Sequence, residues 1–230
     1  MKGLLLKEFY NLRMVFVIYL LVVIFLCFIA FSDGNVINEP TQDGSLPSVE
    51  EMCRNGIYLL MPLMFIGGFY PGNMLISSYS FDEKSHWTPF ILSVGVKKSK
   101  VLLSKVLLHL IATFILLIPF LVALFVMDAP FDISIYVGLI LTFLASCLFS
   151  GSMSLFMCSA IGSSKALVLS SIFSFLTTLI PMGVILIPTV MEGMISSLWI
   201  FGIINFFVFG LLMYILFFFL ALLMFKKRDF

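Results

Sequence analysis

Six long apolar stretches dominate this sequence, and they limit its fold more strongly than any other feature. A helix that crosses a bilayer needs about 20 predominantly apolar residues to span roughly 30 Å of hydrocarbon, where no water can satisfy a bare backbone N–H or C=O. The fold class that we expect is an all-α, polytopic membrane protein with six transmembrane helices. The stretches run over Met14–Phe31, Ile57–Tyr79, Leu103–Met127, Ile133–Ala160, Ala166–Pro188 and Leu198–Phe225.

The overall composition excludes a soluble fold. Hydrophobic residues make up 62% of the 230 positions and charged residues 11%, against about 45–50% and 25% in soluble domains. No internal repeat or separate polar domain interrupts the pattern, so we expect one membrane domain over residues 1–230. The first stretch has 18 residues, which is longer than the core of about 7–15 residues in a cleaved signal peptide, so we expect it to be retained.

The basic residues predict the orientation of the chain. If the stretches cross the membrane in alternation, 12 of the 13 Lys and Arg residues fall on one side, and Arg54 is the exception. Cytoplasmic loops of membrane proteins carry an excess of Lys and Arg. We therefore expect both termini and the 81–101 loop in the cytoplasm, and the polar 32–55 loop outside the cell.

The stretches lack the groups that would let the chain catalyse a reaction or couple transport to an ion. Ion-coupled carriers and channels hold ionisable residues within the membrane, and the one candidate here is His109, which we interpret as a hydrogen-bonded or snorkelling residue. Gly162-Ser163-Ser164-Lys165 lacks the Gly-Lys pair of an ATP-binding loop. The four cysteines have no C-x-x-C spacing; Cys27, Cys147 and Cys158 fall in apolar stretches and are interpreted as packing residues, whereas Cys53 lies in a polar loop. No catalytic residue and no metal site is expected.

Two stripes of small polar residues recur at four-residue spacing. The first predicts close helix packing in lipid, either within one subunit or at a dimer seam, and consists of Ser146, Ser150, Ser154, Cys158 and Gly162. The second predicts contact with a neighbouring helix or with a transport cavity, and consists of Ser170, Ser174 and Thr178.

The segment between the second and third stretches, residues 81–101, combines acidic, aromatic and basic side chains. Asp82 or Ser85 is expected to cap a short helix that exposes Trp87 and Phe90. Composition alone equally allows a short interfacial connector, in which the tryptophan belongs to an aromatic belt and the lysines set the topology.

Two segments give the chain a resemblance to the type-2 permeases of ATP-binding-cassette transporters, particularly the compact bacterial exporters. One is the opening Met1-Lys2-Gly3-Leu4-Leu5-Leu6-Lys7-Glu8-Phe9-Tyr10, and the other is the 81–101 segment, with Phe90-Ile91-Leu92-Ser93 and the basic cluster that ends at Lys105. The resemblance implies an elbow helix over 1–13, a cytoplasmic coupling helix within 81–101 and a re-entrant outer segment over 180–198. It also implies contact with a separate ATPase through Phe81, Asp82, Glu83, Lys84, His86, Trp87, Thr88 and Phe90.

The same resemblance implies partners and a cargo. A second permease, identical or related, would pair with this chain in the bacterial cell membrane. The ATPase subunits would bring Mg–ATP, so the chain itself would carry no cofactor and would not be an enzyme. Because 27 phenylalanines and no charged pocket offer an apolar surface, we expect an amphipathic or hydrophobic peptide, as in exporters of phenol-soluble modulins or antimicrobial peptides. A drug or lipid exporter and a non-transporting membrane interaction or immunity protein stay open as alternatives, and no nucleic-acid partner is expected.

Overall fold

The computed structural model of the chain describes residues 2–34, 70–126, 133–169, 172 and 197–227. This part contains no strand, which confirms the all-α prediction. The expected stripe of Ser170, Ser174 and Thr178, residues 180–196 of the expected outer segment and residues 35–55 of the expected outer loop lie outside it. Its helices are α1 (Lys2–Gly34), α3 (Trp87–Ser93), α4 (Lys98–Val126), α5 (Ile133–Ile161) and α7 (Ser197–Lys227), with further helical segments over 70–84 and 163–169.

Three helices of the described part are long and apolar enough to cross a membrane. They run over Lys98–Phe125, Tyr136–Ile161 and Ile203–Lys227, with 28, 26 and 25 residues. At about 1.5 Å of rise per residue, each is longer than the roughly 30 Å of hydrocarbon in a bilayer. These helices are consistent with the membrane insertion that composition predicts.

The first helix joins two segments that the sequence analysis treats separately. The expected elbow helix over 1–13 and the first apolar stretch belong to one continuous helix, α1, from Lys2 to Gly34. Between Gly3 and Gly34 the helix contains neither glycine nor proline, the residues that most readily interrupt a helix. A break after residue 13 therefore has no local cause in the sequence.

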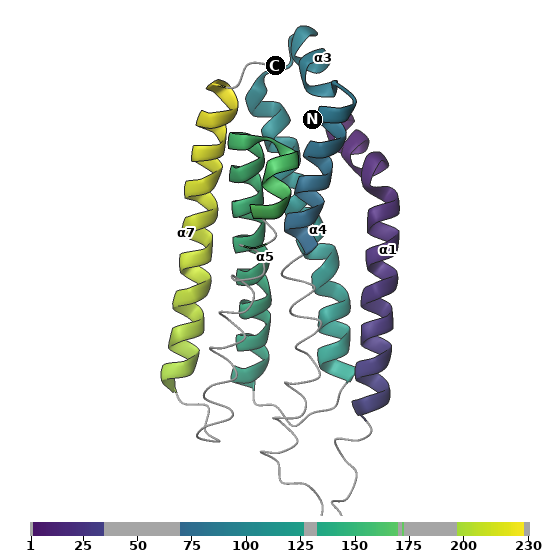
Figure 1. Ribbon diagram of the computed structural model, residues 1–230. Helices are drawn as coiled ribbons and strands as arrows, with labels where there is room; N and C mark the ends of the chain where they lie inside the picture. Colours follow the sequence, from purple (N-terminus) through teal and green to yellow (C-terminus); the bar gives the residue numbers. More distant parts are fainter. Residues whose placement is uncertain (1, 35–69, 127–132, 170–171, 173–196, 228–230) are drawn as a thin grey trace, which may run out of the picture.

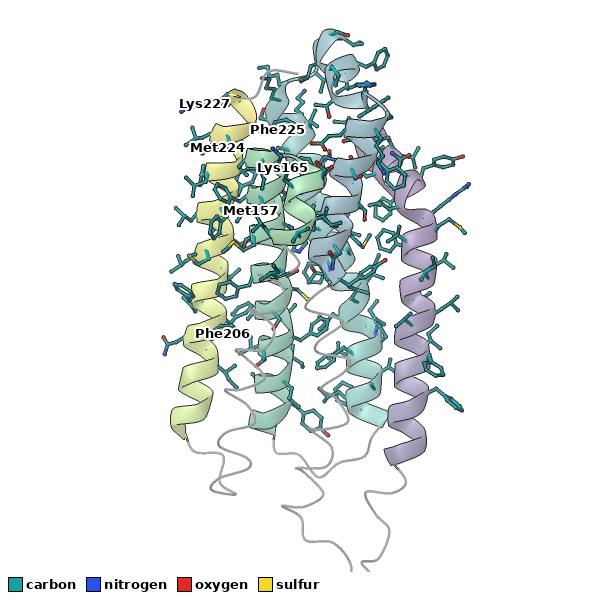
Figure 2. The ribbon with its side chains drawn as sticks, in the orientation of Figure 1. Met157, Lys165, Phe206, Met224, Phe225 and Lys227 are labelled. Carbon is teal, nitrogen blue, oxygen red and sulfur yellow. The ribbon has the colours of Figure 1, made fainter. Side chains whose placement is uncertain are left out.

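The helices form a bundle in which α1 and α7 lie at opposite edges, with α4 and α5 between them (Figure 1). The most extensive packing is between α5 and α7, and α1 packs against α4. Figure 2 shows the side chains of the two edge helices projecting away from the bundle, and those exposed on α7 include Phe209, Leu212 and Phe219. Because soluble monomers rarely expose apolar patches larger than a few hundred Å², this surface suits a lipid environment.

One end of the bundle holds α3, the start of α1 and the end of α7 (Figure 1), and we refer to it as the α3 end. There, Lys98 in the first turn of α4 donates from Nζ to the carbonyl oxygen of Lys226 at 3.1 Å. The fold thus brings the basic residues of three chain segments, far apart in sequence, to the same end.

The small-residue stripe on α5 packs within the subunit. Gly72 of the 70–84 helix lies against it, because a Cβ at that position would be 2.8 Å from Ser154 Oγ and 2.9 Å from the Ser150 carbonyl oxygen. This close approach is the kind that small residues permit between membrane helices. The structure thereby places the stripe inside one chain, at positions that are all buried: Ser146, Ser150, Ser154, Cys158 and Gly162.

His109 connects three of the helices. Its Nε2 lies 3.2 Å from the Cys147 carbonyl oxygen of α5, and its Nδ1 lies 3.0 Å from the Tyr214 hydroxyl of α7. A carbonyl only accepts, so Nε2 carries a proton, and in the neutral ring Nδ1 accepts from the tyrosine hydroxyl. The interpretation of His109 as a hydrogen-bonded residue is confirmed, and both of its nitrogens are engaged inside the bundle.

We expect Gly151→Ala to destabilise the bundle, because an added Cβ would overlap the His109 ring. The ring is buried and bonded on both sides, so it has little room to move, and overpacking of this kind costs about 1–3 kcal/mol. Thermal unfolding of the purified protein in detergent measures the effect. Gly3→Ala is the matched control, since a Cβ there meets nothing within 4 Å. Equal melting temperatures for the two variants would contradict the prediction.

Candidate functional site: a buried ion ring beneath α3

A closed ring of four charged side chains lies where α1, the 70–84 helix and α4 converge at the α3 end. The ring consists of Lys7 and Glu8 from α1, Asp82 from the 70–84 helix and Lys105 from α4. Each lysine contacts both carboxylates, and each carboxylate contacts both lysines. The charges alternate around the ring and sum to zero.

The ring contacts are close and almost dry. Lys105 Nζ lies 2.7 Å from Asp82 Oδ2 and 3.2 Å from Glu8 Oε1, and Lys7 Nζ lies 3.2 Å from the same Glu8 oxygen and pairs with Asp82 Oδ1. Only the Lys7 side chain reaches 16% exposure, whereas the other three are at most 3% exposed. Removing such charges from water costs several kcal/mol per ion, which only close and complete pairing can offset.

Neighbouring polar groups add hydrogen bonds to Lys105 and Glu8 of the ring. Lys105 Nζ donates to Ser78 Oγ at 2.6 Å, and Ser78 in turn donates to Glu8 Oε2. Lys105 Nζ also lies 4.6 Å from the centroid of the Tyr79 ring, a cation–π contact. The Tyr79 hydroxyl is 3.0 Å from Ser159 Oγ on α5, so the network extends from the ring to the central helix.

Glu83 fixes the same helix end to the other side of the bundle. Its carboxylate accepts from the Ser163 amide at 3.0 and 3.2 Å and from the Ser163 hydroxyl. Ser163 follows Gly162, whose positive φ of 86° turns the chain out of α5 into the 163–169 segment. The adjacent carboxylates Asp82 and Glu83 therefore hold the end of the 70–84 helix between α1 and α4 on one side and the 163–169 segment that follows α5 on the other.

The α3 helix follows directly from this anchored end. Its N-cap is His86, with φ of 51° and no capping hydrogen bond from its side chain, so the expectation of a cap at Asp82 or Ser85 is wrong. The Asp82 carboxylate is engaged in the ring, and Ser85 Oγ donates to the Phe81 carbonyl at 2.6 Å. Lys7 Nζ lies 5.2 Å from the centroid of the Trp87 ring, which ties α3 to the ring itself.

The structure places the eight expected ATPase-contacting residues in two groups. The aromatic rings of Trp87 and Phe90 lie 5.8 Å apart, and the Phe90 ring is 58% exposed. Asp82 and Thr88 are buried, so they lie beneath the surface of α3 rather than on it. At least partly accessible at the surface are Phe81, Glu83, Lys84, His86, Trp87 and Phe90.

A groove of about 420 Å³ lies between the first turns of α1, α3 and the start of α4. Leu4, Trp87 and Ile91 give it apolar walls, and Lys100 adds a cation. The groove is next to the exposed Phe90 and provides α3 with a mixed apolar and basic surface of the kind that protein interfaces use.

Sequence reasoning missed the ion ring. Lys105 was counted among the basic residues that set topology, Asp82 was expected to cap a helix or contact an ATPase, and Glu8 was only part of the expected elbow helix. A usable signal was present, because Lys105 stands inside the apolar stretch Leu103–Met127, and a charge at such a position requires a partner.

The described residues offer no group of three or more His, Cys, Asp or Glu side chains that could hold a metal ion. In the ring, each carboxylate already faces two ammonium groups. The arrangement suits a structural and mechanical role, in which charges lock helices together, better than it suits catalysis.

Comparisons with protein-family models, with curated proteins and with solved structures find no match to this chain.

Proposed function

We propose that this chain is the membrane-spanning permease subunit of an ATP-binding-cassette exporter. In this proposal the chain crosses the membrane six times, with both termini and α3 in the cytoplasm. The α3 helix is the coupling helix, and the first turns of α1 form the elbow. The observation that carries the proposal is an exposed aromatic helix attached to a helix end that buried ion pairs fix to the rest of the bundle.

Such an attachment suits the transmission of movement. A coupling helix must move the membrane helices when the ATPase moves it, and a flexible connection would dissipate that movement. Here Asp82 connects the end of the 70–84 helix to α1 and α4, Glu83 connects it to the end of α5, and Lys7 connects α1 to Trp87. Displacement of α3 would therefore shift several helices together.

The partners follow from the resemblance and from the surface at the α3 end. A separate ATPase subunit would bind Mg–ATP and contact Phe90, Trp87 and the groove beside them. A second permease, identical or related, would complete the transport route in a bacterial cell membrane. Lysines of α1, α4 and α7 gather at the α3 end, which supports its cytoplasmic placement under the positive-inside rule.

The proposed cargo is an amphipathic or hydrophobic peptide. The described spanning helices expose apolar side chains, and Lys105, the charged residue within the apolar stretch of α4, is paired in the ring. A cargo that is recognised by such surfaces needs an apolar face of its own.

The test is a complex of this chain with its ATPase, reconstituted in lipid. Amphipathic helical peptides should be transported and should raise ATP turnover, and ATP should change peptide affinity by about 5- to 150-fold, the usual range of coupling between two sites. Hydrophilic peptides are the control. A response to small lipophilic dyes or lipids alone would identify a drug or lipid exporter. If the chain binds no ATPase, the remaining alternative is a non-transporting membrane interaction or immunity protein.

A further inference from the structure

A cavity of about 540 Å³ lies at the α3 end, separate from the ion ring and from the groove beside α3. Its walls come from α1, from one face of the 70–84 helix and from the 163–169 segment. Polar groups on these walls belong to Ser77, Ser80, Lys84 and Ser164, and we call the cavity the inner slot.

Most of the polar side chains that line the inner slot are unpaired within the described residues; the exception is Ser163, which is bonded to the Glu83 carboxylate. Within the described residues, the Lys84 ammonium makes no ion pair, and the hydroxyls of Ser77, Ser80 and Ser164 make no hydrogen bond. Serine hydroxyls elsewhere in the same region do have partners, since Ser85 and Ser104 donate to carbonyl oxygens at 2.6 and 2.7 Å. A free cation and free donors thus line one cavity.

The acidic groups nearest in sequence to Lys84 are already engaged. Asp82 faces two lysines in the ring, and the Glu83 carboxylate accepts hydrogen bonds from the Ser163 amide and hydroxyl. Neither carboxylate forms an ion pair with Lys84, so its ammonium group can pair with an anion from outside the protein.

The slot has its charged side chain at the α3 end and apolar side chains along its length. Lys84 lies nearest α3, and Ile76 lies eight residues earlier on the same helix, about 12 Å along its axis. Val15 and Leu167 add apolar walls, and Val15 stands at the start of the first apolar stretch. This order of groups matches the boundary between lipid headgroups and acyl chains.

We propose that the inner slot binds the phosphate group of an anionic phospholipid from the inner leaflet. Lys84 faces the phosphate, Ser80 and Ser164 donate to its oxygens, and Val15, Ile76 and Leu167 contact the upper acyl chain. The proposal rests on the membrane placement within the proposed function. It requires no ATPase and no cargo, so its test is separable from the test of transport.

The experiment measures lipid binding by the purified chain without any ATPase, using native mass spectrometry with phosphatidylglycerol and phosphatidylcholine. Lys84→Gln should weaken phosphatidylglycerol binding about fivefold, the usual effect of one basic residue at an anionic surface. Ser80→Val should weaken it as well. Lys97→Gln is the control, because Lys97 is equally exposed at the α3 end but does not line the slot.

The site is supported if the Lys84 and Ser80 variants bind phosphatidylglycerol less tightly while the control variant binds it as the wild type does. Circular dichroism must show that all variants are folded. Equal weakening by Lys84→Gln and Lys97→Gln would show nonspecific attraction to the basic end and would overturn it. Equal binding of phosphatidylcholine would also overturn it. Glycerol phosphate distinguishes the source of the anion, and binding of this tail-free compound as tightly as the lipid would contradict the assignment.

Discussion

Replacing Lys105 with methionine should lower the free energy of unfolding by about 3–5 kcal/mol, because it breaks a buried ion network and leaves the remaining charges uncompensated. Lys105 is 1% exposed and pairs with both Glu8 and Asp82. Without it, two carboxylates share the single ammonium of Lys7. Equilibrium unfolding in mixed micelles measures the loss, and Lys97→Met, at an exposed position, should change little.

A second variant separates charge from packing. Glu8→Gln added to Lys105→Met removes one charge of each sign and leaves the pair of Lys7 and Asp82 in place. The double variant should recover part of the lost stability, since no excess carboxylate stays buried. If Lys105→Met unfolds like the wild type, or if Glu8→Gln makes it worse, the ring does not hold the helices together.

Replacing both Trp87 and Phe90 with alanine should strongly weaken binding of the proposed ATPase partner. Truncation of central aromatic residues in an interface commonly costs 2 kcal/mol or more, a loss of about thirtyfold or greater in affinity. Phe90→Ala is the cleaner single change, because its ring is mostly exposed, whereas Trp87 also contacts Lys7. Titration of the detergent-solubilised permease with purified ATPase gives the affinity.

Val94→Ala is the control for this pair, since Val94 is 65% exposed immediately after α3. It should bind ATPase with nearly unchanged affinity. Wild-type affinity and transport in the double aromatic variant would show that α3 is not the principal contact, even if the permease proposal itself survives.

Features that depend on local pattern were predictable from the sequence. The apolar stretches predict helices because lipid leaves the backbone few alternatives, and α4, α5 and α7 follow that pattern. The four-residue repeat of Ser146, Ser150 and Ser154 predicts a packing face, and the structure adds only its location inside the subunit. The exposure of Phe90 on a short helix also agrees with expectation.

Features that depend on distant partners were not predictable in this way. Glu8 and Lys105 are 97 residues apart, and no spacing rule connects them. The N-cap prediction was wrong for the same reason, because the Asp82 carboxylate gains more from two buried lysines than from a local amide. The boundary between the expected elbow helix and the first apolar stretch was not predictable either. Separating the two requires a break in the helix, and α1 is continuous from Lys2 to Gly34.

The central claim, that α3 is the contact through which an ATPase drives this bundle, is tested most directly by site-specific crosslinking in inside-out vesicles. Phe90→Cys, in a Cys53→Ser background, should crosslink to an ATPase that carries a phosphate-binding loop, and added ATP should change the yield. Phe114→Cys, exposed on the middle of α4, should give no such product. Crosslinking from position 114 but not from position 90, or labelling of position 90 from outside intact cells, would contradict the account.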